Sequence, residues 1–255
     1  NKVTSLGFGT ESYITGAYAT YVGQEIGQFY GWVYKGIART QDDLDNNAVQ
    51  QGANIGDCLY EDISGPNGTP DGVIDAYDQT VLGSGLPKVN FGLSTHMEYK
   101  GFDLNISTYG VLNYHVTDDI YNSLNSCYGY GNKDVAMLDA NRWSEDGSTY
   151  LSNVPRTYAA NNATLGWNDL FSSRKIQNAA YWKIANVELG YNFPDKWFGG
   201  YVSGVRLYVS AQNLYTFTGY HGYNVDYAGG TFTPGYNFCS FPSARTFMCG
   251  LHFTF

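Results

Sequence analysis

The chain has 255 residues, of which 17% are aromatic and only 15% are charged, with 31 glycines and a formal net charge of −9. The charged fraction lies well below the roughly 25% of a typical soluble domain. The negative charge argues against nucleic acid as a partner, because a phosphate backbone attracts basic surfaces. No apolar run approaches the ~20 residues of a membrane-spanning helix, which leaves a β-barrel as the possible membrane fold. The composition favours an all-β protein with tight turns.

The N-terminal residues carry no Met, no basic region and no apolar stretch, so they do not form a signal peptide. We therefore interpret the sequence as a mature chain or a fragment of a longer one.

The first motif with possible chemistry is the acidic stretch YEDISGPNGTPDGVIDAYD at residues 60–78. Its second half follows the latter part of an EF-hand loop, in which Gly72 makes the sharp turn and a main-chain carbonyl is one ligand. The inserted GPNGT lengthens the loop, so a solvated acidic turn that binds nothing is the alternative. The predicted structural Ca²⁺ site takes oxygen ligands from Asp62, Asp71, the Val73 carbonyl, Asp75 and Asp78.

Strict alternation of apolar and polar residues, the pattern of a half-buried strand, recurs in five later segments. They are residues 87–100 (PKVNFGLSTHMEYK), 101–110 (GFDLNISTYG), 184–193 (IANVELGYNF), 204–213 (GVRLYVSAQN) and 247–255 (FMCGLHFTF). We predict one strand in each of them.

The connections between these strands differ in length. A tight turn at Lys100 and Gly101 joins the first two strands, and PDKWFGG joins the third and fourth. Long connections cover residues 111–173 and 218–242, and residues 1–86 precede the first strand. Loops this long are uncommon inside a soluble domain. Short turns at one end and long loops at the other are typical of outer-membrane barrels.

We therefore predict an all-β fold, namely the C-terminal strands of a large antiparallel transmembrane β-barrel with long extracellular loops. The final strand alternates up to Phe255, an ending typical of bacterial outer-membrane barrels. Five strands cannot close such a barrel, which needs at least about eight. We expect residues 1–255 to be the C-terminal segment of a longer barrel domain, with 1–86 mostly an extracellular loop region and 87–255 the last five strands and their loops.

The alternation also predicts which side chains face lipid and which face the barrel lumen. The lumen residues are Asn90, Ser94, Glu188, Arg206, Ser210 and His252. The lipid-facing residues are Val89, Phe91, Leu93, Val187, Leu189, Val205, Leu207, Val209, Leu251 and Phe253.

Few other residues suggest chemistry. The histidines lack metal-ligand spacing, and no nucleophile motif is evident, so no catalytic residue is predicted. The cysteines are interpreted as isolated thiols, with a Cys58–Cys127 or Cys127–Cys239 disulfide as the alternative. Aromatic loop runs such as NLYTFTGYHGYN could stack on sugar rings or pack within large loops.

Four segments of this chain resemble motifs of one family. They are VGQEIGQFYGWVYKGI at residues 22–37, YWKIANVELGYNFP at 181–194, VRLYVSAQNLYTFTGYHGYNVD at 205–226 and FPSARTFMCGLHFTF at 241–255. In order and spacing they resemble the C-terminal part of SusC/RagA-type TonB-dependent transporters of the Bacteroidota outer membrane. One departure is Val225 and Asp226, where many relatives carry Pro-Glu.

The resemblance implies a 22-stranded barrel filled by an N-terminal plug that is not in this chain. It implies import of glycans or oligopeptides and no enzymatic activity. The implied partners are the remaining barrel strands and plug, a SusD-like surface lipoprotein, TonB, membrane lipid and lipopolysaccharide. A soluble carbohydrate-binding β-sandwich and a barrel-embedded enzyme are the alternatives.

Overall fold

The computed structural model describes residues 1–7, 9–126, 132–135, 143–144, 153–157, 166–199, 202–226, 229–238 and 240–254. The chain divides into two compact units. One contains residues 1–86, 115–177 and 227–239, and the other contains residues 87–114, 178–226 and 240–255.

No helix within the described ranges has both the length and the apolar character needed to cross a membrane.

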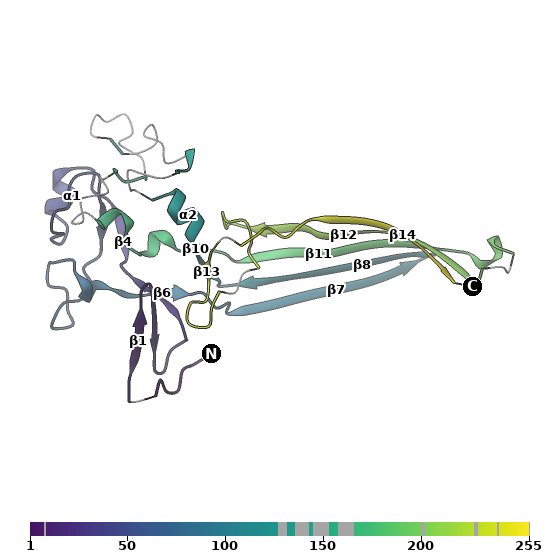
Figure 1. The fold of residues 1–255 in the computed structure, drawn as a ribbon, viewed down its shortest axis with the longest axis horizontal. Coiled ribbons are helices and arrows are strands. Elements are labelled where there is room, and N and C mark those ends of the chain that lie inside the picture. Colours follow the sequence, from purple (N-terminus) through teal and green to yellow (C-terminus); the bar gives the residue numbers. More distant parts are fainter. Residues whose placement is uncertain are drawn as a thin grey trace. The chain divides into compact units, whose positions relative to one another are not determined.

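The second unit is a five-stranded antiparallel sheet with the order β14-β12-β11-β8-β7 (Figure 1). Its strands are β7 (Val89–Tyr99), β8 (Phe102–Leu112), β11 (Tyr181–Phe193), β12 (Gly204–Thr218) and β14 (Thr246–Thr254). The five strands predicted from alternation are confirmed.

A two-residue turn joins β7 to β8. Lys100 has φ 49° and Gly101 has φ 88°, which is the left-handed conformation that a type I′ hairpin turn requires at both positions. Asn192 at the end of β11 donates its main-chain N–H to the Gly101 carbonyl at 2.7 Å. Thr254 pairs with Gly204 at this same end. The short connections therefore lie at one end of the sheet, and the long connections leave from the other.

The two faces of the sheet differ in chemistry, as the alternation predicts. On the apolar face, large side chains remain exposed; Leu93, for example, is 64% accessible. Eight of the ten residues predicted on this face are exposed, and Val187 is half-buried. Val205 is an exception at 8% accessibility, because it lies in register between the large Phe193 and Phe253 side chains.

The opposite face is polar, and it includes all six residues predicted for the lumen. The register aligns Asn90 with Val111 and Ser94 with Ser107, while Glu188 pairs with Ser210. The other two predicted residues, Arg206 and His252, pair with each other across β12 and β14.

A β-bulge in β11 reverses the facing of its first residues. Ile184 pairs with Thr108 and Asn186 pairs with Ser107, so one residue, Ala185, has no partner on β8. Lys183 therefore shares the polar face with its partner Tyr109. In a strand without the bulge, Lys183 would lie on the same face as the apolar Val187, four residues later. The short β10 (Gln177–Asn178) precedes β11, and a 3₁₀ turn, η6 (Asp195–Trp197), follows it.

The first unit contains short strands. A four-stranded sheet has the order β1-β2-β3-β6, β4 pairs with β5, and β9 pairs in parallel with β13. Their bounds are β1 (Ser12–Thr15), β2 (Tyr18–Tyr21), β3 (Gln28–Gly31), β4 (Tyr34–Ile37), β5 (Cys58–Tyr60), β6 (Thr80–Ser84), β9 (His115–Asp118) and β13 (Tyr236–Asn237). The region 1–86 was expected to be mostly loop, and its described residues form six short strands.

The described residues of the first unit also form two short helices and three 3₁₀ turns. They are α1 (Gln41–Asp45), α2 (Asp119–Leu124), η1 (Ala76–Asp78), η4 (Gly166–Asp169) and η5 (Ser173–Lys175). Helix α1 begins with a capping box, in which the Thr40 hydroxyl accepts the Asp43 N–H and the Asp43 carboxylate accepts the Thr40 N–H.

A buried cluster of Cys58, Tyr60 and Ile74 forms a core in this unit, with Trp32 and Trp167 packed against it. Cys58 is buried and Cys249 is exposed. Two other cysteines, Cys127 and Cys239, lie outside the described residues, so the predictions about cysteine pairing that involve them stay predictions.

A network of polar groups joins distant loops beside this core. Asp57, which is buried, accepts two hydrogen bonds from the Arg156 guanidinium, at 2.6 and 2.9 Å. The Asn168 side chain donates to Asp57 at 2.8 Å and accepts the Cys58 N–H at 2.7 Å. This network connects segments that are about a hundred residues apart in the sequence.

Candidate functional site

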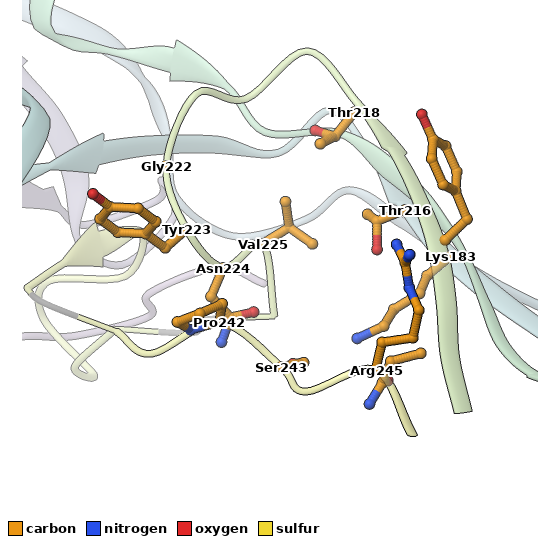
Figure 2. Close-up of a pocket in the computed structure, with 12 residues that line it drawn as sticks. Lys183, Thr216, Thr218, Gly222, Tyr223, Asn224, Val225, Pro242, Ser243 and Arg245 are labelled. Atoms are coloured by element: carbon orange, nitrogen blue, oxygen red, sulfur yellow. The ribbon is translucent and has the colours of Figure 1, made fainter. Parts of the chain in front are cut away.

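A pocket of about 330 Å³ lies at the end of the sheet from which the long connections leave (Figure 2). It is lined by Lys183, Asn213, Tyr215, Thr216, Thr218, Gly222, Tyr223, Asn224, Val225, Pro242, Ser243 and Arg245. Figure 2 shows Lys183 and Arg245 on one side of the pocket and the segment 223–225 on the other. The lining carries two cations and no carboxylate.

The loop after β12 turns back to form one wall of this pocket. Thr218 at the strand end accepts the Tyr220 N–H at 3.1 Å, and its hydroxyl donates to the Ala180 carbonyl at 3.0 Å. Tyr220 is buried, and its ring occupies the space that a side chain on Gly222 would need, since a Cβ there would lie 2.2 Å from the ring. A side chain at position 222 would therefore require the Tyr220 ring to move.

Asp226 lies eight residues after the end of β12 and forms an ion pair with Lys183. The Tyr109 hydroxyl lies 3.3 Å from both carboxylate oxygens of Asp226. The Lys183 side chain is only 4% accessible, and a buried ammonium requires a counter-charge and hydrogen bonds. Asp226 supplies both, so the loop that carries it is held against the polar face of the sheet.

The opposite wall ends at Arg245, just before β14. The Asn213 side chain donates to the Ala244 carbonyl at 2.9 Å, which fixes the chain next to Arg245. Asn213 itself has φ 51°, a conformation that asparagine tolerates better than most residues. Within the described part of the chain, the Arg245 guanidinium has no ion-pair partner.

A second cluster of charges lies on the polar face near the short-turn end of the sheet. Arg206 donates to Asp103 through Nε at 3.0 Å and through Nη2, and Nη2 also donates to Glu188 at 2.7 Å. The Asn192 side chain adds a bond to Asp103 at 3.1 Å. All these groups are partnered, so the cluster ties three strands together and presents no open site.

Two histidines lie on the polar face, and His96 takes an ordinary hydrogen-bonding role there. His96 lies between Asn105, at 2.6 Å from Nδ1, and Glu98, at 2.9 Å from Nε2. His252 is on the same face, opposite Arg206.

The acidic segment 60–78 is held by its own main chain. Asp62 accepts the N–H groups of Asp71 and Gly72, at 3.3 and 2.7 Å. Asp71 accepts the Val73 N–H at 3.1 Å, and Asp75 caps η1 by accepting the Tyr77 N–H at 2.7 Å.

Asp78 is the most enclosed of these aspartates and is fully buried. It accepts the N–H groups of Ile63, Ser64 and Asp75 at 2.9, 3.2 and 2.8 Å. Among the described residues, no group of three or more His, Cys, Asp or Glu side chains gathers closely enough to hold a metal ion. The bonds described here account for the loop conformation through main-chain donors, and calcium stays a prediction.

The pairing of Lys183 with Asp226 was not found from the sequence. The β11 bulge, which places Lys183 on the polar face, leaves no clear pattern of its own in the sequence. One available signal was the position of Asp226, where relatives of the resembled family carry the other carboxylate, Glu.

No family model matches the chain. TonB-dependent receptor P3 of Formosa agariphila is 30% identical over 242 residues, which is 91% of this chain and 22% of that protein. TonB-dependent receptor SusC of Bacteroides thetaiotaomicron is 26% identical over 209 residues, 77% of this chain and 19% of that protein. The solved structure of the RagAB peptide transporter matches all of this chain and 25% of its own, with a TM-score of 0.75 and 21% identity.

The chain belongs to the SusC/RagA-type TonB-dependent receptors. It spans about a fifth of the length of the sequence relatives that it matches. The RagAB peptide importer in its closed-closed state matches equally well, with a TM-score of 0.75 and 22% identity. The five-stranded sheet is therefore a section of a SusC/RagA-type barrel, and it is not closed within these residues.

Proposed function

We propose that this chain supplies the C-terminal strands and loops of an outer-membrane importer of glycans or oligopeptides. A SusD-like surface lipoprotein would cover the importer, and TonB would power it through a plug outside these residues. The names of the relatives support receptor and transport functions, and one structural neighbour is named a peptide transporter. The location in the outer membrane of a Bacteroidota-like cell, in contact with lipid and lipopolysaccharide, belongs to the same proposal.

One observation carries this proposal: a single sheet has an exposed apolar face and a polar face with partnered charges. Leu93, Leu189 and Val209 project from the apolar side and are exposed. A soluble β-sandwich would bury such a face against a second sheet, whereas lipid covers it in a membrane barrel. The enzyme alternative gains no support from relatives that carry receptor and transporter names.

The edges of the sheet support a larger barrel. Within this sheet, β7 pairs only with β8, and β14 pairs only with β12. An unpaired main-chain group in the bilayer costs several kcal/mol, so membrane strands occur in closed barrels. We infer that other strands of the same protein pair with both edges and that the first unit forms part of the extracellular surface beneath the lid.

The test uses the full-length receptor in its native host. A deletion strain should lose uptake of the substrate, and the intact gene should restore it, whereas a copy without its TonB-contacting segment should not. Fluorescently labelled oligosaccharides and oligopeptides, tested in parallel, would separate the two substrate classes. Unchanged uptake and growth of the deletion strain on both classes of nutrient would contradict the proposal.

A further inference from the structure

We propose that the pocket between β12, the loop after it and the start of β14 binds an anionic group of the transported substrate. The group would be a carboxylate, and its main contact would be the Arg245 guanidinium. This inference rests on the proposed import function and adds the chemical class of the ligand.

The charge of the pocket is the first argument. The whole chain is acidic, with a net charge of −9, yet the residues that line this pocket include Lys183 and Arg245 and no Asp or Glu. Asp226 neutralises Lys183 from outside the lining. The positive charge of Arg245 has no such partner among the described residues, so an anion that enters the pocket would meet an uncompensated cation.

The open hydrogen-bond donors are the second argument. Within the described structure, the hydroxyls of Thr216 and Ser243 have no assigned hydrogen-bond partner. Asn224 accepts the Asp226 N–H through its side-chain oxygen at 3.0 Å, which turns the amide oxygen inward toward its own loop. A guanidinium forms a two-point contact with a carboxylate, and nearby hydroxyls can also bond its oxygen atoms.

The walls of the pocket are positioned before any ligand binds. The Asn213 to Ala244 bond fixes the segment next to Arg245, and the Lys183–Asp226 pair fixes the loop on the other side. A site whose walls are fixed in this way loses less entropy on binding. The volume of about 330 Å³ lies at the lower end of ligand pockets, roughly 300–1,000 Å³, which suits one charged sugar unit or one peptide end.

The test measures binding to the purified full-length receptor in detergent with two matched pairs of probes. One pair is tetragalacturonate and its fully methyl-esterified form. The other is tetra-alanine with a free C-terminal carboxylate and its C-terminal amide. We expect the charged member of at least one pair to bind more tightly, and the pair that discriminates identifies the source of the carboxylate.

The variant Arg245→Gln should weaken binding of the charged probe about 10- to 100-fold, the range expected for a charge-assisted hydrogen bond, and should leave the neutral probe unchanged. Arg245→Lys keeps the charge and should lose less. Lys100→Gln, in the turn at the other end of the sheet, is the matched control for loss of a positive charge. Thermal unfolding of each variant verifies folding, and Arg245→Lys keeps the test valid if Arg245→Gln does not fold.

Equal binding of the charged and neutral forms, or equal loss in Arg245→Gln and Lys100→Gln, would overturn the proposal, as would binding of neither pair. Failure of the import function would be seen differently, as unchanged uptake in the deletion strain. Loss of uptake in the deletion strain, together with equal binding of the charged and neutral probes, would reject the anion site alone.

Discussion

Asp103 on β8 and Arg206 on β12 form a two-point ion pair that crosses Gly190 on the strand between them. A Cβ on Gly190 would lie 2.4 Å from the Asp103 carboxylate and 2.5 Å from the Arg206 guanidinium. The absence of a side chain therefore lets two strands that are not neighbours connect through their charges.

Replacing this glycine should break the connection. In the full-length receptor, Gly190→Ala is expected to lower the free energy of unfolding by about 1–3 kcal/mol, the usual cost of an inserted methyl group in a packed site. Either the ion pair separates or β11 shifts. Thermal unfolding in detergent, followed by the loss of folded-barrel mobility on a gel, measures the effect.

The matched control is Gly92→Ala on the same polar face. A Cβ at Gly92 would have its nearest neighbour at 3.7 Å, the Thr108 carbonyl oxygen, which is an ordinary contact. Equal stability of the two variants would show that the space over Gly190 is not needed for the ion pair.

The Asp226 carboxylate should hold the pocket loop in place. Asp226→Asn would leave the buried Lys183 ammonium without its counter-charge, so we expect a loss of about 2–4 kcal/mol of local stability, somewhat below the full cost of a broken buried pair because Asp226 is 23% accessible. Hydrogen exchange of the main-chain N–H groups in residues 219–226 should become faster.

The conservative variant Asp226→Glu keeps the negative charge and has the residue type that the family resemblance associates with this position. It should retain most of the protection. If Asp226→Asn and Asp226→Glu accelerate exchange equally, the ion pair does not hold the loop.

The five strands of the sheet could be predicted from the sequence because a period of two is a local property. The family resemblance could also be found from the sequence, because short local motifs carry it. The Lys183–Asp226 pair was not, because its facing depends on the bulge at Ala185 and its partner is 43 residues away. The short strands of residues 1–86 were also missed, since strands of three to five residues give too few positions to establish a period.

The calcium motif shows a different limit of sequence reasoning. A series of aspartates predicts a cation site because their charges repel one another. Main-chain N–H groups that donate to the carboxylates can compensate the same charges. Asp62 and Asp78 each receive such donors, and the sequence alone does not indicate which of the two compensations a loop uses.

The opposite faces of β7 make a direct test of membrane orientation. Leu93→Arg places a charge on the exposed apolar face and should cost about 2–4 kcal/mol if that position lies near the middle of the bilayer. Ser94→Arg, one residue further along the chain and on the polar face, should cost much less because it points toward the lumen. Folding of the full-length receptor into lipid vesicles, measured by urea titration, gives both values.

Equal costs for the two arginine variants would contradict the assignment of the faces. A larger cost for Ser94→Arg than for Leu93→Arg would reverse it, and the sheet would then have to face a protein core on its apolar side.

The fully buried Asp78 separates the two explanations for the acidic loop. Asp78→Ala should remove the acceptor for three main-chain N–H groups, those of Ile63, Ser64 and Asp75, at a cost of about 1–3 kcal/mol for each donor left unsatisfied. If these bonds hold the loop, limited proteolysis of residues 60–78 in the full-length receptor should accelerate equally in calcium and in a chelator. The calcium hypothesis predicts instead that the chelator alone exposes the wild-type loop and that Asp78→Ala has little further effect once calcium is removed. Tyr77→Ala, which changes a neighbouring exposed side chain and leaves every carboxylate in place, is the control for local disturbance.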